Sequence, residues 1–186
     1  MLRTRYLELE GIVEITPKRY EDERGFFSEV YNEKLQGEAG INIRWVQDNV
    51  SLSPIRSTIR GLHFQEPPMA QDKLVRVPRG RILDVVVDLR RNSKTFGKSL
   101  TVEISAQKWN QLLVPVGFAH GLITLEDDTE VHYKVSNFYA PEHDKGILWC
   151  DPDLDIDWGL DLGEVLVSPK DQVQPKLSEI TSPFWV

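Results

Sequence analysis

The stretch RILDVVVDL, residues 81–89, decides the fold of this chain. It is rich in β-branched residues, which favour strands, and the side chains of a strand point alternately to two faces. Asp84, Val86 and Asp88 then share one face, whereas Leu83, Val85, Val87 and Leu89 form the other. The pattern predicts a strand with one apolar face and one face that carries two acids.

Working outward from this strand, the same criteria predict several more. We expect further strands at 26–31, 74–77, 100–104, 111–114, 118–124 and 130–136. Turn signals rich in Pro and Gly, such as residues 78–80 and 115–117, separate them. Many short strands with turns between them predict an all-β fold, a closed or sandwiched antiparallel sheet of jelly-roll type. Such a barrel offers one interior, and a ligand is expected at its mouth.

Helix is expected to be scarce. One short helix is predicted over residues 32–36, and another near the end of the chain. There Ser168, Pro169 and Asp171 follow the pattern of a helix N-terminus, with a capping hydroxyl, a proline at the first helical position and an acid at the third.

The composition excludes several classes of protein. The 186 residues are 40% hydrophobic and 27% charged, which predicts one folded domain, residues 1–186, rather than a disordered chain. No apolar run approaches the ~18 residues of a membrane span. The start, MLRTRYLELEG, lacks the features of a secretory signal. We therefore expect a cytoplasmic protein without a membrane partner, in which the single cysteine, Cys150, is buried and inert.

The charge is unevenly distributed. A net charge of −7 argues against a nucleic-acid partner. The segment from Arg56 to Arg91 nevertheless holds eight basic residues and four acidic ones. Either its arginines bind a small anion such as a phosphate ester, or it is a solvated strand edge with ion pairs. Composition alone leaves both interpretations open.

The chemistry-bearing residues point to proton transfer rather than to a metal. The histidines are His63, His120, His132 and His143. No two of them have the His-x-His or His-x-x-x-His spacing typical of metal sites, so we expect no metal ion. The segment RGLHFQ, residues 60–65, precedes Lys73, Tyr133 and Tyr139. A histidine base, a cation and phenols in one barrel mouth suit abstraction of a proton next to a carbonyl, although strand histidines and tyrosines are more often structural.

Motifs along most of the chain resemble those of the dTDP-4-dehydrorhamnose 3,5-epimerase family. They are RGFFSE at 24–29, QDN at 47–49, RGLHFQ at 60–65, KLVRV at 73–77, VVDLR at 86–90, TFG at 95–97, PVGFAHG at 115–121, YAPEH at 139–143 and IDW at 156–158. The resemblance implies a cupin-type jelly roll that needs no metal or cofactor and is usually a homodimer.

The resemblance also implies a substrate and a reaction. The substrate is a dTDP-linked 4-keto-6-deoxyhexose, whose ketone acidifies the hydrogens on C3 and C5, and both centres are inverted to give dTDP-4-dehydro-L-rhamnose. The alternatives are an epimerase that inverts only C3, a sugar-nucleotide-binding cupin without catalysis and a metal-dependent cupin oxygenase. Incubation with the ketosugar in deuterated water separates the first two.

Roles carry over residue by residue from the resemblance. His63 would be the base, Asp171 would orient it, Lys73 would lie near the enolate oxygen and Tyr133 would protonate the opposite face. The expected substrate contacts are Arg24, Glu29, Gln47, Asp48, Asn49, Arg60, His120, Tyr139, Asp144 and Lys170. Asp84 is an alternative partner for His63. Asp144 stands where the family tends to carry the longer Glu, so a contact that the Glu makes would be shortened or lost here.

Overall fold

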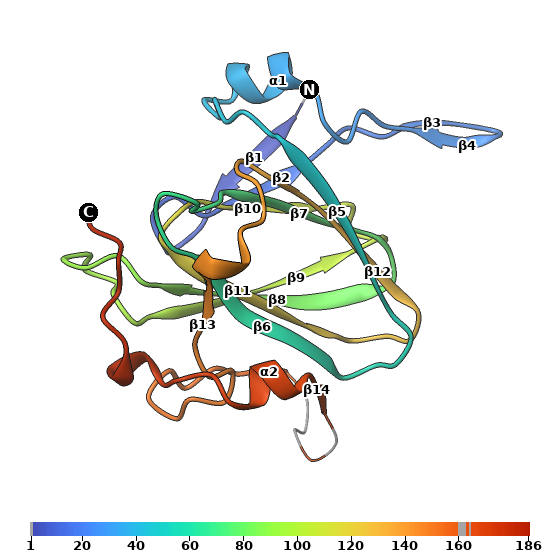
Figure 1. Ribbon diagram of the computed structural model, residues 1–186. Helices are drawn as coiled ribbons and strands as arrows, with labels where there is room; N and C mark the ends of the chain where they lie inside the picture. The colour runs from blue at the N-terminus through green and yellow to red at the C-terminus, as the bar shows by residue number, and fades with distance from the viewer. Residues whose placement is uncertain (1, 160–162, 164) are drawn as a thin grey trace.

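The chain folds into two antiparallel β-sheets that face each other (Figure 1). The computed structural model describes residues 2–159, 163 and 165–186. The first sheet contains, in spatial order, β1 (Arg3–Tyr6), β2 (Val13–Thr16), β10 (Gln111–Val114), β7 (Lys73–Arg79), β12 (Thr129–Val135) and β5 (Gln47–Ser53). The second contains β13 (Asp144–Gly146), β6 (Thr58–Gln65), β11 (Phe118–Thr124), β8 (Arg81–Asp88) and β9 (Ser99–Ser105), and β14 (Leu166–Val167) pairs in parallel with β6. This arrangement is a jelly roll, as predicted.

The β8 strand shows why both faces of the second sheet are buried. Its inward side chains include Val86, which packs with Val75 and Leu112 of the first sheet in the core between the sheets. Its outward side chains include Val85 and Val87, which belong to a second apolar core. The alternation predicted from the sequence therefore holds, with apolar residues on both faces and acids on the inner one.

The end of the chain covers the outer face of the second sheet (Figure 1). Ile147, Leu154, Trp158 and Phe184 pack there against the outward side chains of the sheet. This segment includes α2 (Pro169–Gln172) and the 3-10 helix η3 (Leu177–Glu179), and the 3-10 helix η1 (Pro141–His143) precedes it. Residues from this part of the chain reach β6 through β13, β14 and α2.

Both predicted helices are present. The first is α1 (Glu33–Glu38), whose N-terminus is capped by the Asn32 side chain, and the segment that follows it covers part of the outer face of the first sheet. At the start of α2, the Ser168 hydroxyl accepts a hydrogen bond from the Asp171 amide at 3.1 Å. The predicted capping hydroxyl is thereby confirmed.

Some strand predictions were wrong. Only Phe26 and Phe27 of the predicted strand 26–31 lie in a strand, β4 (Gly25–Phe27). It pairs with β3 (Tyr20–Asp22) in a hairpin that projects from the barrel (Figure 1). The aromatic residues that suggested a core strand, Phe26 and Phe27, are exposed. The strands β1, β2, β3, β5, β6, β13 and β14 were not predicted. β1 is exposed throughout, and β5, QDNVSLS, has few apolar residues.

The predicted burial of Cys150 was also wrong, because its side chain is exposed. Trp149, the residue before it, packs against Trp158 at a ring distance of 6.1 Å. Successive residues of an irregular segment can face opposite ways, and here the aromatic neighbour takes the inner position.

Asp88, the last residue of β8, anchors the turn that follows it. It is fully buried, and its carboxylate accepts hydrogen bonds from the Arg90 guanidinium at 2.8 and 2.9 Å and from the hydroxyls of Ser93 and Thr95 at 2.7 Å. Burial alone raises the pKa of a carboxyl group, but these donors outweigh it and lower the pKa of Asp88 to about 2.

The shifted pKa of Asp88 predicts how stability depends on pH. A carboxyl group whose folded pKa lies below its unfolded value stabilises the fold above the unfolded pKa, and this contribution is lost as the pH falls through the folded pKa. We expect Asp88→Asn to lower the free energy of unfolding by about 2 kcal/mol at pH 6. The difference from wild type should shrink toward zero as the pH falls from 4 to 2. Urea unfolding at several pH values measures this, and a difference independent of pH would contradict it.

Candidate active site

A cavity of about 200 Å³ opens between the two sheets and brings together five of the predicted site residues. Arg60 and His63 reach it from β6, His120 from β11, Lys73 from β7 and Tyr133 from β12. Ser51, Val75, Gly121, Leu122 and Val131 complete its wall and were not predicted. Alternation along β5 and β12 could have indicated Ser51 and Val131, which lie two residues from Asn49 and Tyr133 on the same faces.

The imidazole of His63 is held by a carboxylate from the end of the chain. His63 Nε2 lies 2.5 Å from Asp171 Oδ1, and Asp171 Oδ2 accepts a hydrogen bond from the Gly61 amide at 3.3 Å. Asp171 is buried, which opposes its ionisation, but the hydrogen bond and the charge of His63 together with the Gly61 and Ser168 donors hold its pKa below the usual range. Asp171 is therefore an anion at neutral pH and fixes one nitrogen of the ring.

Lys73 and Tyr133 face His63 from the opposite sheet. Lys73 Nζ donates a hydrogen bond to the His63 carbonyl oxygen at 3.3 Å. Loss of solvent lowers the pKa of Lys73 to about 8, and the Asp84 and Asp144 carboxylates partly offset this effect. Burial also raises the pKa of the Tyr133 phenol. At neutral pH the cavity thus holds an ammonium group and a protonated phenol.

Asp84 pairs with His120 instead of His63. The two Asp84 oxygens lie 3.0 and 2.8 Å from His120 Nε2, and Asp84 is fully buried. His120 and His63 are register partners on the adjacent strands β11 and β6. The two histidines are therefore neighbours across this strand pair, and each has a carboxylate of its own. The structure settles the alternative left open by the sequence, because Asp171 is the carboxylate that contacts His63.

Tyr139, Asp144 and Lys170 form a linked group beside β6. The Asp144 carboxylate accepts a hydrogen bond from the Tyr139 hydroxyl at 3.1 Å and pairs with Lys170 Nζ at 2.6 Å. Asp144 stands opposite Gln65 in the pairing of β13 with β6, and its charge influences the pKa values of both Lys73 and Tyr133. This group is thus close to the cavity, and the short Asp144 side chain still makes both contacts.

Gln47 and Asn49 lie on the inner face of β5, in line with Ser51. Their side chains are joined by a hydrogen bond of 2.8 Å, and Gln47 Oε1 accepts a hydrogen bond from the Tyr139 amide at 3.3 Å. Asn49 is the register partner of Tyr133. The two amides therefore extend the polar lining from the cavity toward Tyr139.

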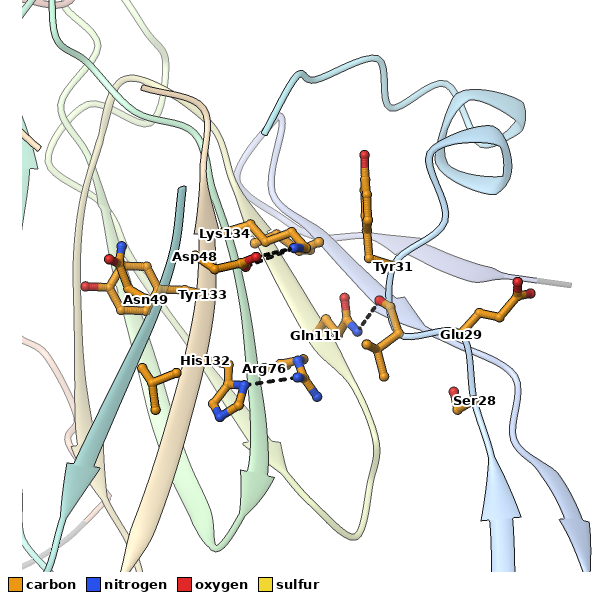
Figure 2. A pocket seen from close by; sticks show the side chains of 13 residues that line it. Ser28, Glu29, Tyr31, Asp48, Asn49, Arg76, Gln111, His132, Tyr133 and Lys134 are labelled. Atoms are coloured by element: carbon orange, nitrogen blue, oxygen red, sulfur yellow. Dashed lines mark hydrogen bonds and ion pairs between the residues drawn. The ribbon is translucent and has the colours of Figure 1, made fainter. Parts of the chain in front are cut away.

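Three predicted contacts do not reach this cavity within the same chain. Asp48 points to the outer face of β5, where it pairs with Lys134 at 2.8 Å, and Figure 2 shows it on the side away from Asn49 and Tyr133. Glu29 lines the same outer hollow, of about 500 Å³. Arg24 lies between β3 and β4 of the projecting hairpin, where it pairs with Asp22.

The outer hollow has a histidine of its own, but that ring is fully engaged. His132 Nδ1 lies 3.0 Å from the Arg76 guanidinium (Figure 2). Its Nε2 lies 2.5 Å from Glu130. Neither nitrogen is free to accept a proton from a ligand. We therefore place the candidate chemistry in the inner cavity.

The basic segment from Arg56 to Arg91 divides in the structure. Arg60 and Lys73 line the cavity, whereas Arg81 and Arg90 pair with neighbouring carboxylates. The ion-pair interpretation therefore holds for Arg81 and Arg90, and anion binding by Arg60 stays a prediction. In the described ranges, no three His, Cys, Asp or Glu side chains are grouped so that they could hold a metal ion. No helix among the described residues is long and apolar enough to cross a membrane.

The jelly roll and its cavity define a class of protein. A histidine paired with a carboxylate, an ammonium group and a phenol around one small cavity are the parts of an enzyme that removes and returns protons on carbon, so the protein is a cupin-type isomerase. The sequence model of the dTDP-4-dehydrorhamnose 3,5-epimerase family matches residues 6–179. The chain belongs to this family.

Individual relatives agree with this assignment. The dTDP-4-dehydrorhamnose 3,5-epimerase of Methanothermobacter thermautotrophicus is 47% identical over 173 residues, which are 92% of each chain. The dTDP-6-deoxy-D-glucose-3,5-epimerase of Legionella pneumophila, solved in complex with dTDP-4-keto-L-rhamnose, is 38% identical with a TM-score of 0.94 and full coverage of both chains. A dTDP-4-dehydrorhamnose 3-epimerase of Streptomyces niveus is 37% identical over 179 residues, 96% of this chain and 85% of that one.

The close approach of β6 and β11 at Gly121 predicts a sensitive position. A Cβ atom at Gly121 would lie 2.8 Å from the Arg60 carbonyl oxygen and 3.3 Å from Gly61 Cα, both backbone atoms. We expect Gly121→Ala to push the strands apart beside His63 and His120, lowering the free energy of unfolding by roughly 1–3 kcal/mol and reducing turnover.

Gly37→Ala in α1 is the matched control for this variant. Its Cβ would meet only the Asn42 side-chain oxygen, at 3.3 Å, which can turn aside. Thermal unfolding and an epimerase assay on both variants test the prediction. A Gly121→Ala protein as stable and active as the control would show that the strand contact does not set the geometry of the cavity.

Proposed function

We propose that the protein converts dTDP-4-dehydro-6-deoxy-D-glucose to dTDP-4-dehydro-L-rhamnose by inverting C3 and C5 of the sugar. The observation that carries this proposal is the pairing of His63 with Asp171 on one side of the cavity, opposite Lys73 and Tyr133 on the other sheet. Inversion needs a base on one face of the carbon and an acid on the other, and the cavity has both.

His63 is the base in this proposal. Its Nε2 is committed to Asp171, so Nδ1 accepts the proton from C3 or C5 of the sugar. The ionised Asp171 stabilises the imidazolium that forms, as the aspartate of a catalytic triad does. The electron pair of the broken C–H bond moves into the carbonyl group and leaves a negative charge on the C4 oxygen.

Lys73 and Tyr133 complete the reaction from the opposite sheet. The Lys73 ammonium stabilises the enolate oxygen in a cavity with little water, where such an interaction is strong. The Tyr133 phenol is protonated at neutral pH because burial raises its pKa. It returns a proton to the carbon from the face away from His63. Water then takes the proton from His63 and reprotonates Tyr133, and repetition at the second carbon gives the double inversion.

The nucleotide is bound outside the cavity in this proposal. A space of about 200 Å³ accommodates a hexose, and the diphosphate and the base extend along the rim. Arg60 and Lys170 supply cations for the phosphates, and the remaining rim contacts are His120, Gln47, Asn49, Tyr139 and Asp144. The Asp48 side chain points away from the cavity and is not included.

The first test uses the ketosugar nucleotide in deuterated water. We expect wild type to exchange the hydrogens at both C3 and C5, followed by NMR, and His63→Ala to lose roughly 10²–10⁴-fold in rate while still binding dTDP. Arg60→Ala is the comparison variant, in which nucleotide binding weakens more than turnover. Exchange at C3 alone would identify a 3-epimerase, and full turnover by His63→Ala would remove this residue as the base.

A homodimer accounts for Arg24 and Glu29, which do not reach the cavity of their own chain. The hairpin that carries Arg24 projects from the barrel (Figure 1). The aromatic rings of Phe26 and Phe27 on it are exposed. We therefore propose that this hairpin contributes Arg24, and the segment that follows it contributes Glu29, to the cavity rim of a second copy. Exposed aromatic residues on a projecting arm are the kind of surface that a partner covers.

Mixing two inactive variants tests this arrangement. Arg24→Ala and His63→Ala chains, unfolded together and refolded, form heterodimers in which one of two sites has every residue if Arg24 acts across the interface. Activity should then recover to about a quarter of wild type, since half of the dimers are mixed and each has one intact site. If Arg24 acts within its own chain, no dimer has a complete site, and the mixture is no more active than the two variants measured separately. Refolded wild type is the control.

We propose that the protein acts in the cytoplasm. The exposed thiol of Cys150 remains reduced in that compartment. Fractionation of cells that produce the protein measures the location.

A further inference from the structure

Asp84 is a buried charge next to the cavity that the proposed reaction does not use. Its carboxylate is fully buried on the inner face of β8 and makes its hydrogen bonds to His120 Nε2, at 3.0 and 2.8 Å. The His120 side chain is 10% exposed. Burying a carboxylate is costly unless nearby groups compensate its charge, so its presence here calls for partners.

The register of three neighbouring strands places this pair beside the proposed base. His120 on β11 stands opposite His63 on β6, and β8 lies on the other side of β11. Two histidines therefore line one wall, each with a carboxylate on Nε2. The His120 Nδ1 atom makes no hydrogen bond to any described residue, and it is the ring nitrogen left for a ligand.

Lys73 is the cation that faces this wall. The charged and titratable groups around it are Asp84 from β8, Asp144 from β13, His63 and Arg60 from β6, His120 from β11, Tyr133 from β12, and Asp171 behind His63. Asp144 is already paired with Lys170, and Asp171 with His63. Of these three carboxylates, Asp84 is the one that makes all its hydrogen bonds to a side chain lining the cavity, that of His120.

We propose that Asp84 is a positioning residue for the epimerisation, which holds His120 with Nδ1 available to the sugar and balances the ammonium charge of Lys73. The proposal rests on the proposed function, because both partners act on the ketosugar. Without the Asp84 charge, the low-polarity cavity would disfavour the Lys73 cation, and the enolate would lose its main stabilising charge.

The electrostatic part has a defined sign. Burial lowers the pKa of Lys73 to about 8. The negative charge of Asp84 opposes this effect, so without it the pKa of Lys73 would be lower still. Activity that needs protonated Lys73 then declines as the pH rises through about 8 in wild type. Replacing Asp84 with a neutral residue lowers the pKa of Lys73, so that this decline begins at a lower pH.

Asp84→Asn and Asp84→Ala separate the two roles. Asparagine keeps an oxygen that accepts the His120 Nε2 hydrogen but removes the charge, so we expect kcat to fall roughly tenfold or more and the basic limb of the pH profile to move to lower pH. Alanine also frees the ring, so KM for the ketosugar should rise as well. Rates are measured by NMR from pH 6 to 9.

Asp88→Asn is the matched control, because Asp88 is also a fully buried acid on the inner face of β8 but pairs with Arg90. This variant should lose stability and keep the wild-type pH profile. If Asp84→Asn keeps both kcat and the pH profile while wild type turns over, the inference is wrong and the proposed function stands. A wild-type protein that neither exchanges nor epimerises the ketosugar overturns the proposed function itself.

A second measurement needs no variant and no turnover. In wild-type protein with ¹⁵N-labelled histidine, NMR should show His120 with a hydrogen on Nε2, which is bonded to Asp84. A His120 ring with bare Nε2 would overturn the proposal even if Asp84→Asn failed to fold. Titration of ¹³C-labelled lysine in wild type and Asp84→Asn follows Lys73 directly, and an unchanged pKa would remove the electrostatic role.

Discussion

The contact between His63 Nε2 and Asp171 Oδ1 is the interaction on which the site depends. It joins the middle of β6 to the first turn of α2, 108 residues further along the chain. The contact requires the end of the chain to lie against the outer face of the second sheet, and the apolar core formed there by residues such as Leu62 and Trp158 provides the energy. Packing on one side of the sheet thus fixes a polar contact on the other.

The two sheets divide the chemistry between them. The second sheet supplies two histidines, each held by a buried carboxylate, whereas the first supplies the ammonium group of Lys73 and the phenol of Tyr133. Because the groups come from facing layers, a sugar ring bound between them would meet, under the proposed function, a base on one side and an acid on the other. A jelly roll is therefore a suitable scaffold for inversion, in which the two faces of a carbon must be treated differently.

Much of the fold and part of the site could be predicted from the sequence. The alternation in β8 gave the correct faces, because burial on both sides leaves a clear apolar pattern. β1 and β5 gave no such signal, because β1 is exposed throughout and the inward positions of β5, such as Asn49 and Ser51, are polar. The pairing of Asp84 with His120, rather than with His63, depends on the register of β11 between β6 and β8, which no local pattern contains. For the same reason, the sequence could not show that Asp48 points outward or that Arg24 lies on a projecting arm.

The position of Asp171 has a consequence for synthesis of the protein on the ribosome. Every strand that lines the cavity has been translated once β12 is complete at Val135, and the sheets can pair from that moment. The carboxylate that holds the base emerges only later, with the segment that seals the outer face of the barrel. A nascent chain therefore passes through a stage in which every strand of the cavity has been made but the His63 ring still lacks its Asp171 partner.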